Sequence, residues 1–160
     1  MLESFAMPDL LVNLLKLPSR ELAATQQFSI RRAQPFEATL VRRFIEQHFS
    51  VTWADEVSVG FVHQPVSIYI ATMGGGIVGF AAYECTRRGF FGPTGVATQA
   101  RGRGIGKALL LASLYAMREM GYVYAIIGGA GPIDFYKESV DAIVIPDSGS
   151  SIYIDLLKSN

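Results

Sequence analysis

The sequence predicts a single α/β domain built on a mixed β-sheet. Short apolar runs, typical of strands, alternate with longer runs at helical spacing along most of the chain. A glycine-rich turn joins one of these strand-like runs to the longest helical run. The chain has 160 residues, of which 50% are hydrophobic and 18% charged, so it can bury one substantial core. It has no repeat, low-complexity tract or interdomain linker.

The first 26 residues are expected to form an amphipathic helix and a linker, ahead of a domain over residues 27–160. Four leucines share one face at helical spacing: Leu10, Leu11, Leu14 and Leu15. The apolar run from Met7 to Leu17 follows Glu3 rather than a basic region, and it is too short to span a membrane. We expect this helix to pack on its own domain. Packing on a second copy, which would give a homodimer, is the alternative.

The elements that follow are predicted from local pattern. Residues 28–32 alternate with period two and predict a strand, and Gln34-Pro35 begins a helix that runs to about Phe49. Residues 51–64 fit either a short second helix or a loop. Two further strands, 66–72 and 77–85, are joined by a glycine turn.

The second half continues this alternation. Strands are predicted over residues 90–97, 122–127, 142–145 and 151–156, and helices over 105–120 and from Pro132 onward. Pro132 suits the first position of a helix, where its missing N–H costs nothing, and Asp134 suits the helix dipole. Gly92-Pro93 interrupts the strand at 90–97, because proline cannot donate to a ladder.

The turn between the strand at 90–97 and the long helix predicts an anion site. Backbone N–H groups and the positive end of the helix dipole converge there, and a phosphate or pyrophosphate suits them best. Two common phosphate motifs fail on spacing. Gly106-Lys107 is followed by Ala108, so the hydroxyl that a Walker loop or kinase-type site needs is missing, and no glycine stands where a dinucleotide fingerprint needs its third.

What remains is the pattern Arg-x-x-Gly-x-Gly at Arg101, Gly104 and Gly106. It resembles the acetyl-CoA-binding signature of the GCN5-related N-acetyltransferases (GNAT family). The resemblance covers about residues 28–156 and implies a mostly antiparallel central sheet flanked by helices, splayed between its fourth and fifth strands. The alternative is a helix start that uses its glycines only for a tight turn.

The resemblance also implies which residues hold acetyl-CoA. The pyrophosphate would lie on the whole loop: Arg101, Gly102, Arg103, Gly104, Ile105, Gly106 and Lys107. The pantetheine arm would enter the splay and pair with backbone groups of the fourth strand at Gly95, Val96 and Ala97. Phe135 would face the core or this arm.

The chemistry implied is acetyl transfer to an amine. Deprotonating a lysine-like amine costs about 4.6 kcal/mol at pH 7, so a base or a desolvating pocket is needed. Tyr136 matches the family's tyrosine near the thioester sulfur and would protonate the departing thiolate. Several relatives carry a carboxylate on the fourth strand, and this chain has none there. Glu84 is the nearest alternative base, and three further carboxylates follow it: Asp55, Glu56 and Asp134.

Acceptor residues are expected between Phe49 and His63 and on the fourth strand. Trp53, Asp55, Glu56 and Thr94 are the candidates, because acids favour a cationic amine and tryptophan stacks on a sugar or ring. We therefore expect an N-acetyltransferase of a small primary amine, an amino sugar being one candidate, acting by direct attack in a ternary complex. A non-catalytic acetyl-CoA-binding sensor or regulatory module is the alternative.

Net charge and cysteine content exclude several other classes of protein. Fourteen basic and 14 acidic side chains give a formal net charge of zero, so neither a nucleic-acid surface nor a membrane surface is expected. Cys85 is the single cysteine, and with only two histidines no metal-ligand spacing exists. Without a disulfide framework, a reducing, cytoplasmic setting is expected.

Overall fold

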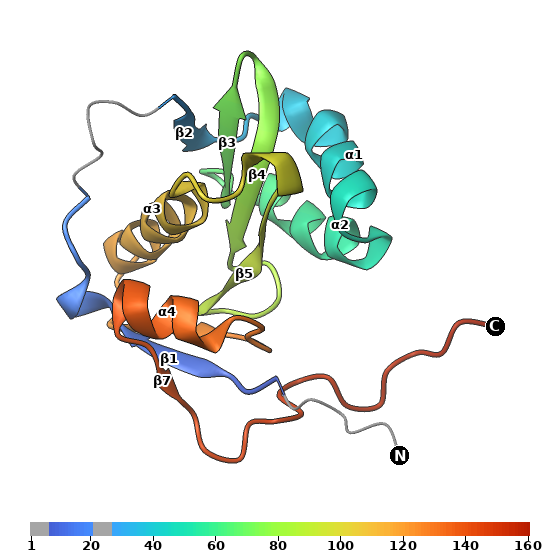
Figure 1. The fold of residues 1–160 in the computed structure, drawn as a ribbon. Helices are drawn as coiled ribbons and strands as arrows, with labels where there is room; N and C mark the ends of the chain where they lie inside the picture. The colour runs from blue at the N-terminus through green and yellow to red at the C-terminus, as the bar shows by residue number, and fades with distance from the viewer. Residues whose placement is uncertain (1–6, 21–26) are drawn as a thin grey trace.

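A seven-stranded mixed sheet forms the centre of the computed structural model, which describes residues 7–20 and 27–160 (Figure 1). The strands are β1 (Leu10–Asn13), β2 (Ser29–Arg32), β3 (Ile68–Met73), β4 (Gly76–Tyr83), β5 (Phe90–Val96), β6 (Tyr124–Ile127) and β7 (Ile143–Val144). They lie in the order β2-β3-β4-β5-β6-β1-β7, and every neighbouring pair is antiparallel except β5 and β6. The predicted mixed, mostly antiparallel sheet is confirmed.

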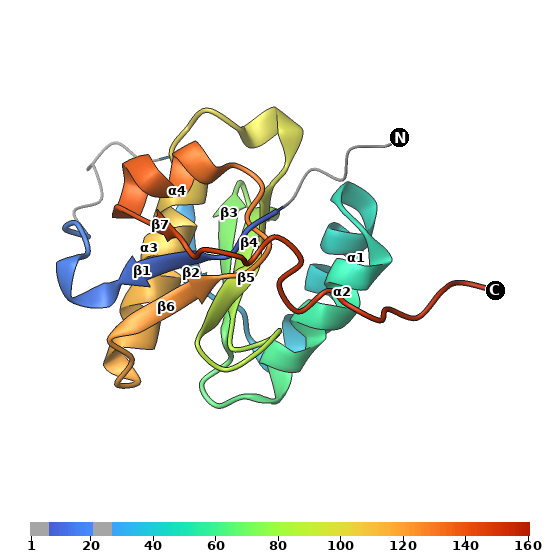
Figure 2. The ribbon, with the colours of Figure 1, turned by 90° about the horizontal axis from the view of Figure 1, so that it is seen from below.

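Helices cover both faces of this sheet. They are α1 (Ala38–His48), α2 (Val51–Ser58), α3 (Ile105–Glu119) and α4 (Ile133–Val140), with short 3-10 turns at Leu14–Lys16, Pro35–Glu37, Val59–Val62 and Thr98–Ala100. Figures 1 and 2 show α1 and α2 on one side of β3 and β4, and α3 on the other. Within the described ranges, no helix combines the length and apolar composition that crossing a bilayer requires.

Because side chains of β4 alternate between the two faces of the sheet, this strand contributes to two hydrophobic cores. Phe80 and Ala82 pack with α1 and α2, whereas Ala81 and Tyr83 pack with α3. All four side chains are buried. β4 is therefore covered on both faces, and β3 and β5 pair with its two edges.

The expected N-terminal amphipathic helix over residues 1–26 is wrong where the structure describes it. Leu10–Asn13 is a strand that lies between β6 and β7, and Leu10, Val12 and Leu14 are fully buried. These three leucine and valine positions alternate with period two, but the adjacent leucines mask the alternation with a helical spacing. The segment packs within its own chain, while residues 1–6 and 21–26 lie outside the described residues.

A second correction concerns the end of the chain. The strand predicted over residues 151–156 is absent, and this segment follows an irregular path (Figure 2). Ser151 and Asp155 adopt positive φ angles, which break a strand, and Ile154 and Leu156 are exposed. The place next to β6 is taken by β1, so this segment has no sheet position there to fill.

Candidate functional site: a glycine loop, an open strand edge and a pocket

The glycine loop before α3 presents a run of free amides. Gly102 and Gly104 have φ angles of 78° and 81°, and Gly104 is the N-cap of α3. The first helical bond runs from the Ala108 N–H to the Gly104 carbonyl at 3.1 Å. Among the described residues, the N–H groups of residues 102–107 have no hydrogen-bond acceptor. The loop therefore offers an exposed set of donors at the positive end of a 15-residue helix.

The basic side chains of the loop differ in what they contact. The Arg101 Nε donates to the Val96 carbonyl at 3.2 Å, which ties the loop to the end of β5. Arg103 reaches Gln27 at 3.4 Å, and Lys107 is exposed. Arg103 and Lys107 are thus the side chains with reach toward an anion at the amides.

One edge of β5 is open over most of its length. β5 pairs with β6 only at Phe90 and Phe91, and the two strands then part at Gly92-Pro93. This is the predicted splay between the fourth and fifth strands of the resembling fold, which are β5 and β6 here because β1 precedes them. The strand beyond Phe91 leaves its outer backbone groups without a partner strand.

The ladder between β4 and β5 identifies which amide faces this edge. The Ala97 N–H donates to the Val78 carbonyl at 2.8 Å, so the neighbouring pair Gly79–Val96 is of the non-hydrogen-bonded type. The Val96 N–H therefore points away from β4, toward the open edge. Gly95 faces β4 in the alternating register, opposite Phe80. Of Gly95, Val96 and Ala97, the structure turns only the Val96 amide into the gap.

Aromatic side chains cover the α1–α2 face of β5. A Cβ built on Gly95 would lie 2.3 Å from the Phe49 ring, so only glycine lets this ring lie flat on the strand. Trp53 stacks on Phe49 with 5.4 Å between ring centroids and 23° between planes. Ser50 caps α2 by accepting the Trp53 N–H at 3.1 Å, and this cap fixes where the helix carrying Trp53 begins.

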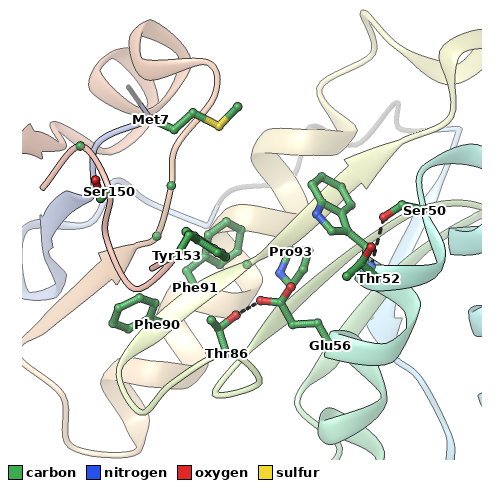
Figure 3. Close-up of a pocket in the computed structure, with 15 residues that line it drawn as sticks. Met7, Ser50, Thr52, Glu56, Thr86, Phe90, Phe91, Pro93, Ser150 and Tyr153 are labelled. Carbon is green, nitrogen blue, oxygen red and sulfur yellow. Dashed lines mark hydrogen bonds between the residues drawn. The ribbon is translucent and has the colours of Figure 1, made fainter. Parts of the chain in front are cut away.

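A pocket of about 600 Å³ opens where β5 and β6 separate. Its walls come from α2, from β5 at the split, from the glycines just after β6 and from the C-terminal segment (Figure 3). Trp53 and Tyr153 both line it, and Figure 3 shows Glu56 and Thr86 joined by a hydrogen bond beside Tyr153 and Pro93. The pocket therefore joins the open strand edge to an aromatic-walled space that admits a small molecule.

Acidic groups dominate the electrostatics of this pocket. Glu56 lines it, accepts a hydrogen bond from the Thr86 hydroxyl through Oε1, and has no partner for Oε2 among the described residues. Asp9 is buried beside it and accepts the Gly129 N–H at 2.9 Å. Burial, then the charges of Glu56 and Asp9, raise the pKa of Tyr153. The pocket thus favours a cation.

The other predicted carboxylates lie elsewhere. Glu84 is half-buried with both oxygens used: Oε1 accepts the Gly89 N–H at 2.6 Å, and Oε2 accepts the Tyr122 hydroxyl at 3.1 Å. It closes the turn between β4 and β5 and does not line the pocket. Asp55 is exposed and pairs with Arg42 at 3.2 Å.

Thr94, a predicted acceptor residue, uses its hydroxyl inside the sheet. Its Oγ1 donates to the Phe80 carbonyl at 3.0 Å, and it is not among the pocket residues. Of the four predicted acceptor residues, Trp53 and Glu56 are the two that the structure brings to the pocket.

Tyr136 and Phe135 connect the loop to the split. Phe135 lies near the glycine loop, since a Cβ built on Gly106 would meet it, and also Val96, at 3.8 Å. Tyr136 is 5% exposed and meets Phe91, a pocket residue, edge to face with 6.3 Å between centroids. Burial raises the pKa of Tyr136 to about 12, so its phenol stays protonated through the neutral range.

Three residues at this site escaped the sequence interpretation: Phe49, Asp9 and Tyr153. Asp9 and Tyr153 come from the two ends of the chain, where the prediction had a helix and a strand. The residues next to an isolated acid or tyrosine in such a segment do not predict a pocket. The pocket forms because the order of the strands brings the segments together.

Comparison with known proteins agrees with this geometry. Residues 64–138 match the family model of the acetyltransferase (GNAT) domain. No curated protein shows significant similarity to the chain. Among solved structures, the GCN5-related N-acetyltransferase from Sphaerobacter thermophilus superposes with a TM-score of 0.69 and 19% identity, over 86% of this chain and 48% of that one.

Two more structures share the fold. One contains a GCN5-related glucosamine N-acetyltransferase region of a fungal multi-domain GH3 β-N-acetylglucosaminidase, with a TM-score of 0.68 and 17% identity over 86% of this chain and 19% of that one. The other is a GNAT family acetyltransferase from Brucella melitensis in complex with acetyl-CoA, with a TM-score of 0.55 and 18% identity over 76% of this chain and 90% of that one. The chain thus spans less than half the length of the first two.

The splayed sheet and the free amides of the glycine loop agree with the match of residues 64–138 to the acetyltransferase (GNAT) domain.

Proposed function

We propose that the protein transfers an acetyl group from acetyl-CoA to the primary amine of a small molecule, by direct attack within a ternary complex. The observation that carries this proposal is the open edge of β5. It runs from the free amides of the glycine loop to the pocket at the split, so one elongated ligand can contact both. Bound along this edge, acetyl-CoA supplies the acetyl group as a thioester.

The residues present fit this coenzyme. The N–H groups of residues 102–107 donate to the pyrophosphate, and Arg103 and Lys107 add charge. Gly106 leaves the space beside Phe135 and Val96 free of a side chain. The Val96 N–H, which has no partner in β4, is available to polarise the thioester carbonyl oxygen.

Glu56, rather than Glu84, is the acid that we assign to the amine. Both Glu84 oxygens are already engaged, whereas Glu56 faces the pocket with one oxygen free. Glu56 attracts the ammonium form of the acceptor and then takes its proton, which releases the lone pair for attack. The neighbouring Asp9 adds to the negative potential of the pocket.

Tyr136 is the proposed acid for the departing sulfur. The C–S bond breaks as the N–C bond forms, and the thiolate takes up the proton of the phenol. The proton that the nitrogen loses on becoming an amide then restores the phenol. The high pKa of Tyr136, caused by its burial, keeps this proton in place through the working range of pH. Its contact with Phe91 holds the ring beside the split.

The aromatic walls suggest the class of acceptor. Trp53 and Tyr153 line a pocket that contains one free carboxylate oxygen, a combination that suits an amine carried on a ring. An amino sugar meets this description, because its apolar face packs on an aromatic ring. The similar fungal region acts on glucosamine, which makes glucosamine the first acceptor to test.

The test is a screen for thiol release from acetyl-CoA with glucosamine, polyamines, free amino acids and aminoglycosides. We expect turnover with at least one cationic amine, and a loss of about a hundredfold in kcat/KM in Glu56→Gln. Asp55→Asn is the matched control, because this neighbouring carboxylate pairs with Arg42 at the surface and should leave turnover unchanged. Binding of acetyl-CoA without turnover on any amine would instead favour a non-catalytic sensor.

A further inference from the structure

A second pocket, of about 560 Å³, lies at the far end of α3 from the glycine loop. It is formed by the segment after α2, the end of β4 and the last turn of α3, and its charged or polar lining includes Arg32, His63, Glu84 and Glu119. Ala116 at its rim is about 16 Å along the helix from Ile105, at 1.5 Å per residue. The proposed acetyl transfer uses none of these side chains.

Arg32 is held rigidly in this pocket with donors to spare. Its NH1 donates to the Val66 carbonyl at 2.7 Å and to the Tyr83 hydroxyl. The guanidinium lies over the Tyr69 ring at 4.8 Å from its centroid. Its NH2 and Nε have no acceptor among the described residues. An arginine fixed by stacking and by two bonds on one nitrogen presents its other N–H groups as a ready-made carboxylate site.

His63 is oriented in the same pocket by a buried hydroxyl. Its Nδ1 is 2.8 Å from the Oγ of Ser67, which is 2% exposed. The other ring nitrogen, Nε2, has no partner in the described part of the chain. Arg32 and His63 therefore line one cavity, Arg32 with free N–H groups and His63 with a ring nitrogen that has no partner among the described residues.

The rest of the lining opposes a simple anion. Glu119 stands at the C-terminal, negative end of α3, and its side chain is 66% exposed and lies 4.0 Å from the Arg20 guanidinium. Glu84 adds a further negative charge, although its own bonds are satisfied. Val62 and Met120 contribute exposed apolar surface. A ligand that matches the cationic, acidic and apolar parts of this lining must carry a negative charge, a positive charge and an apolar group.

We infer that this pocket binds a free apolar α-amino acid. Its carboxylate pairs with Arg32 and His63, its ammonium lies toward Glu119, and its side chain covers Val62 and Met120. The inference goes beyond the proposed acetyl transfer and does not depend on it, because the two pockets share no lining residue.

The test is calorimetric titration of the full chain with L-leucine, L-methionine and L-phenylalanine. We expect saturable binding of at least one, weakened about tenfold or more in Arg32→Gln. Because Arg32 also stacks in the fold, Glu119→Gln at the surface is the second variant, and it should weaken binding several-fold while the melting temperature is unchanged. Glu56→Gln, in the other pocket, should leave the affinity as it is.

Analogues separate the two charges. N-acetyl-L-leucine lacks the ammonium and isopentylamine lacks the carboxylate, and each should bind at least about tenfold more weakly than L-leucine. The inference is overturned if none of the three amino acids binds at 10 mM, or if N-acetyl-L-leucine binds as well as L-leucine. It is equally overturned if Glu56→Gln abolishes binding while the Arg32 and Glu119 variants retain it.

Discussion

Gly104→Ala is the substitution that tests the coenzyme site most directly. Gly104 caps α3 with φ of 81°, and a Cβ built there meets no atom within 4 Å. The change therefore adds backbone strain without a clash. A left-handed non-glycine residue costs about 1–2 kcal/mol, which lowers the melting temperature of a chain of this size by about 2–8 °C.

The effect on acetyl-CoA should be larger than the effect on stability. Relief of the strain rotates the peptide that follows Gly104, and this turns the Ile105 N–H away from the pyrophosphate. A hydrogen bond to a charged group is worth about 1.5–3 kcal/mol, so we expect acetyl-CoA to bind about ten- to a hundredfold more weakly. Calorimetric titration of the folded variant with acetyl-CoA measures this difference.

Gly121→Ala is the matched control. Gly121 follows the same helix, has φ of 104° and also has free space around a built Cβ. It should lose comparable stability and keep its affinity for acetyl-CoA, because it lies at the opposite end of α3. If Gly104→Ala melts like this control and binds acetyl-CoA with unchanged affinity, the loop does not hold the pyrophosphate and the assignment fails.

Three further predictions concern single side chains. Tyr136→Phe should lower kcat about a hundredfold with little change in the Kd for acetyl-CoA, and a fully active variant would remove the assigned role. In the wild type, the rate should not fall between pH 6 and 10 through ionisation of this acid, because burial raises the pKa of Tyr136 to about 12. Glu84→Ala should lower the free energy of unfolding, measured by chemical denaturation, by about 1–3 kcal/mol, because it leaves the Gly89 N–H unpaired. Glu84→Gln should retain turnover, and an inactive but folded Glu84→Gln would instead identify Glu84 as the base. Cys85→Ala should remain active. In the wild type, Cys85 should resist iodoacetamide at pH 8, because burial raises the pKa of its thiol to about 11, and rapid alkylation of the folded chain would contradict this.

The glycine loop shows what local sequence can predict about this site. Arg101 to Lys107 stand between a strand and a helix in sequence, and a loop at such a junction must present its amides at the helix start whatever the rest of the fold does. The position of Gly92-Pro93 likewise predicted where β5 would part from its neighbour, because proline cannot extend a ladder.

The acceptor side could not be predicted in the same way. Glu56 and Glu84 are both acids next to apolar runs, and nothing in their local sequence says which has a free oxygen. The turn closed by Glu84 and the arrival of α2 beside β5 decide it. The choice of Glu56 as the proposed base therefore depends on tertiary contacts.

The N-terminal segment shows where local sequence pattern fails to predict secondary structure. Leucines at positions 10, 11, 14 and 15 have helical spacing, whereas Leu10, Val12 and Leu14 alternate as in a strand, so the choice depends on what surrounds them. A vacant place between β6 and β7 selects the strand, because it completes the hydrogen bonds of both neighbours and buries Leu10, Val12 and Leu14.

By itself, the sequence determined the α/β class, the anion-binding helix start and the break in β5, since each depends on residues adjacent in the chain. Only the tertiary structure decided the strand order, the free oxygen of Glu56 and the enclosure of the pocket by Tyr153. These features arise from contacts between separate segments of the chain, whose energies depend on burial and pairing partners that no local pattern contains.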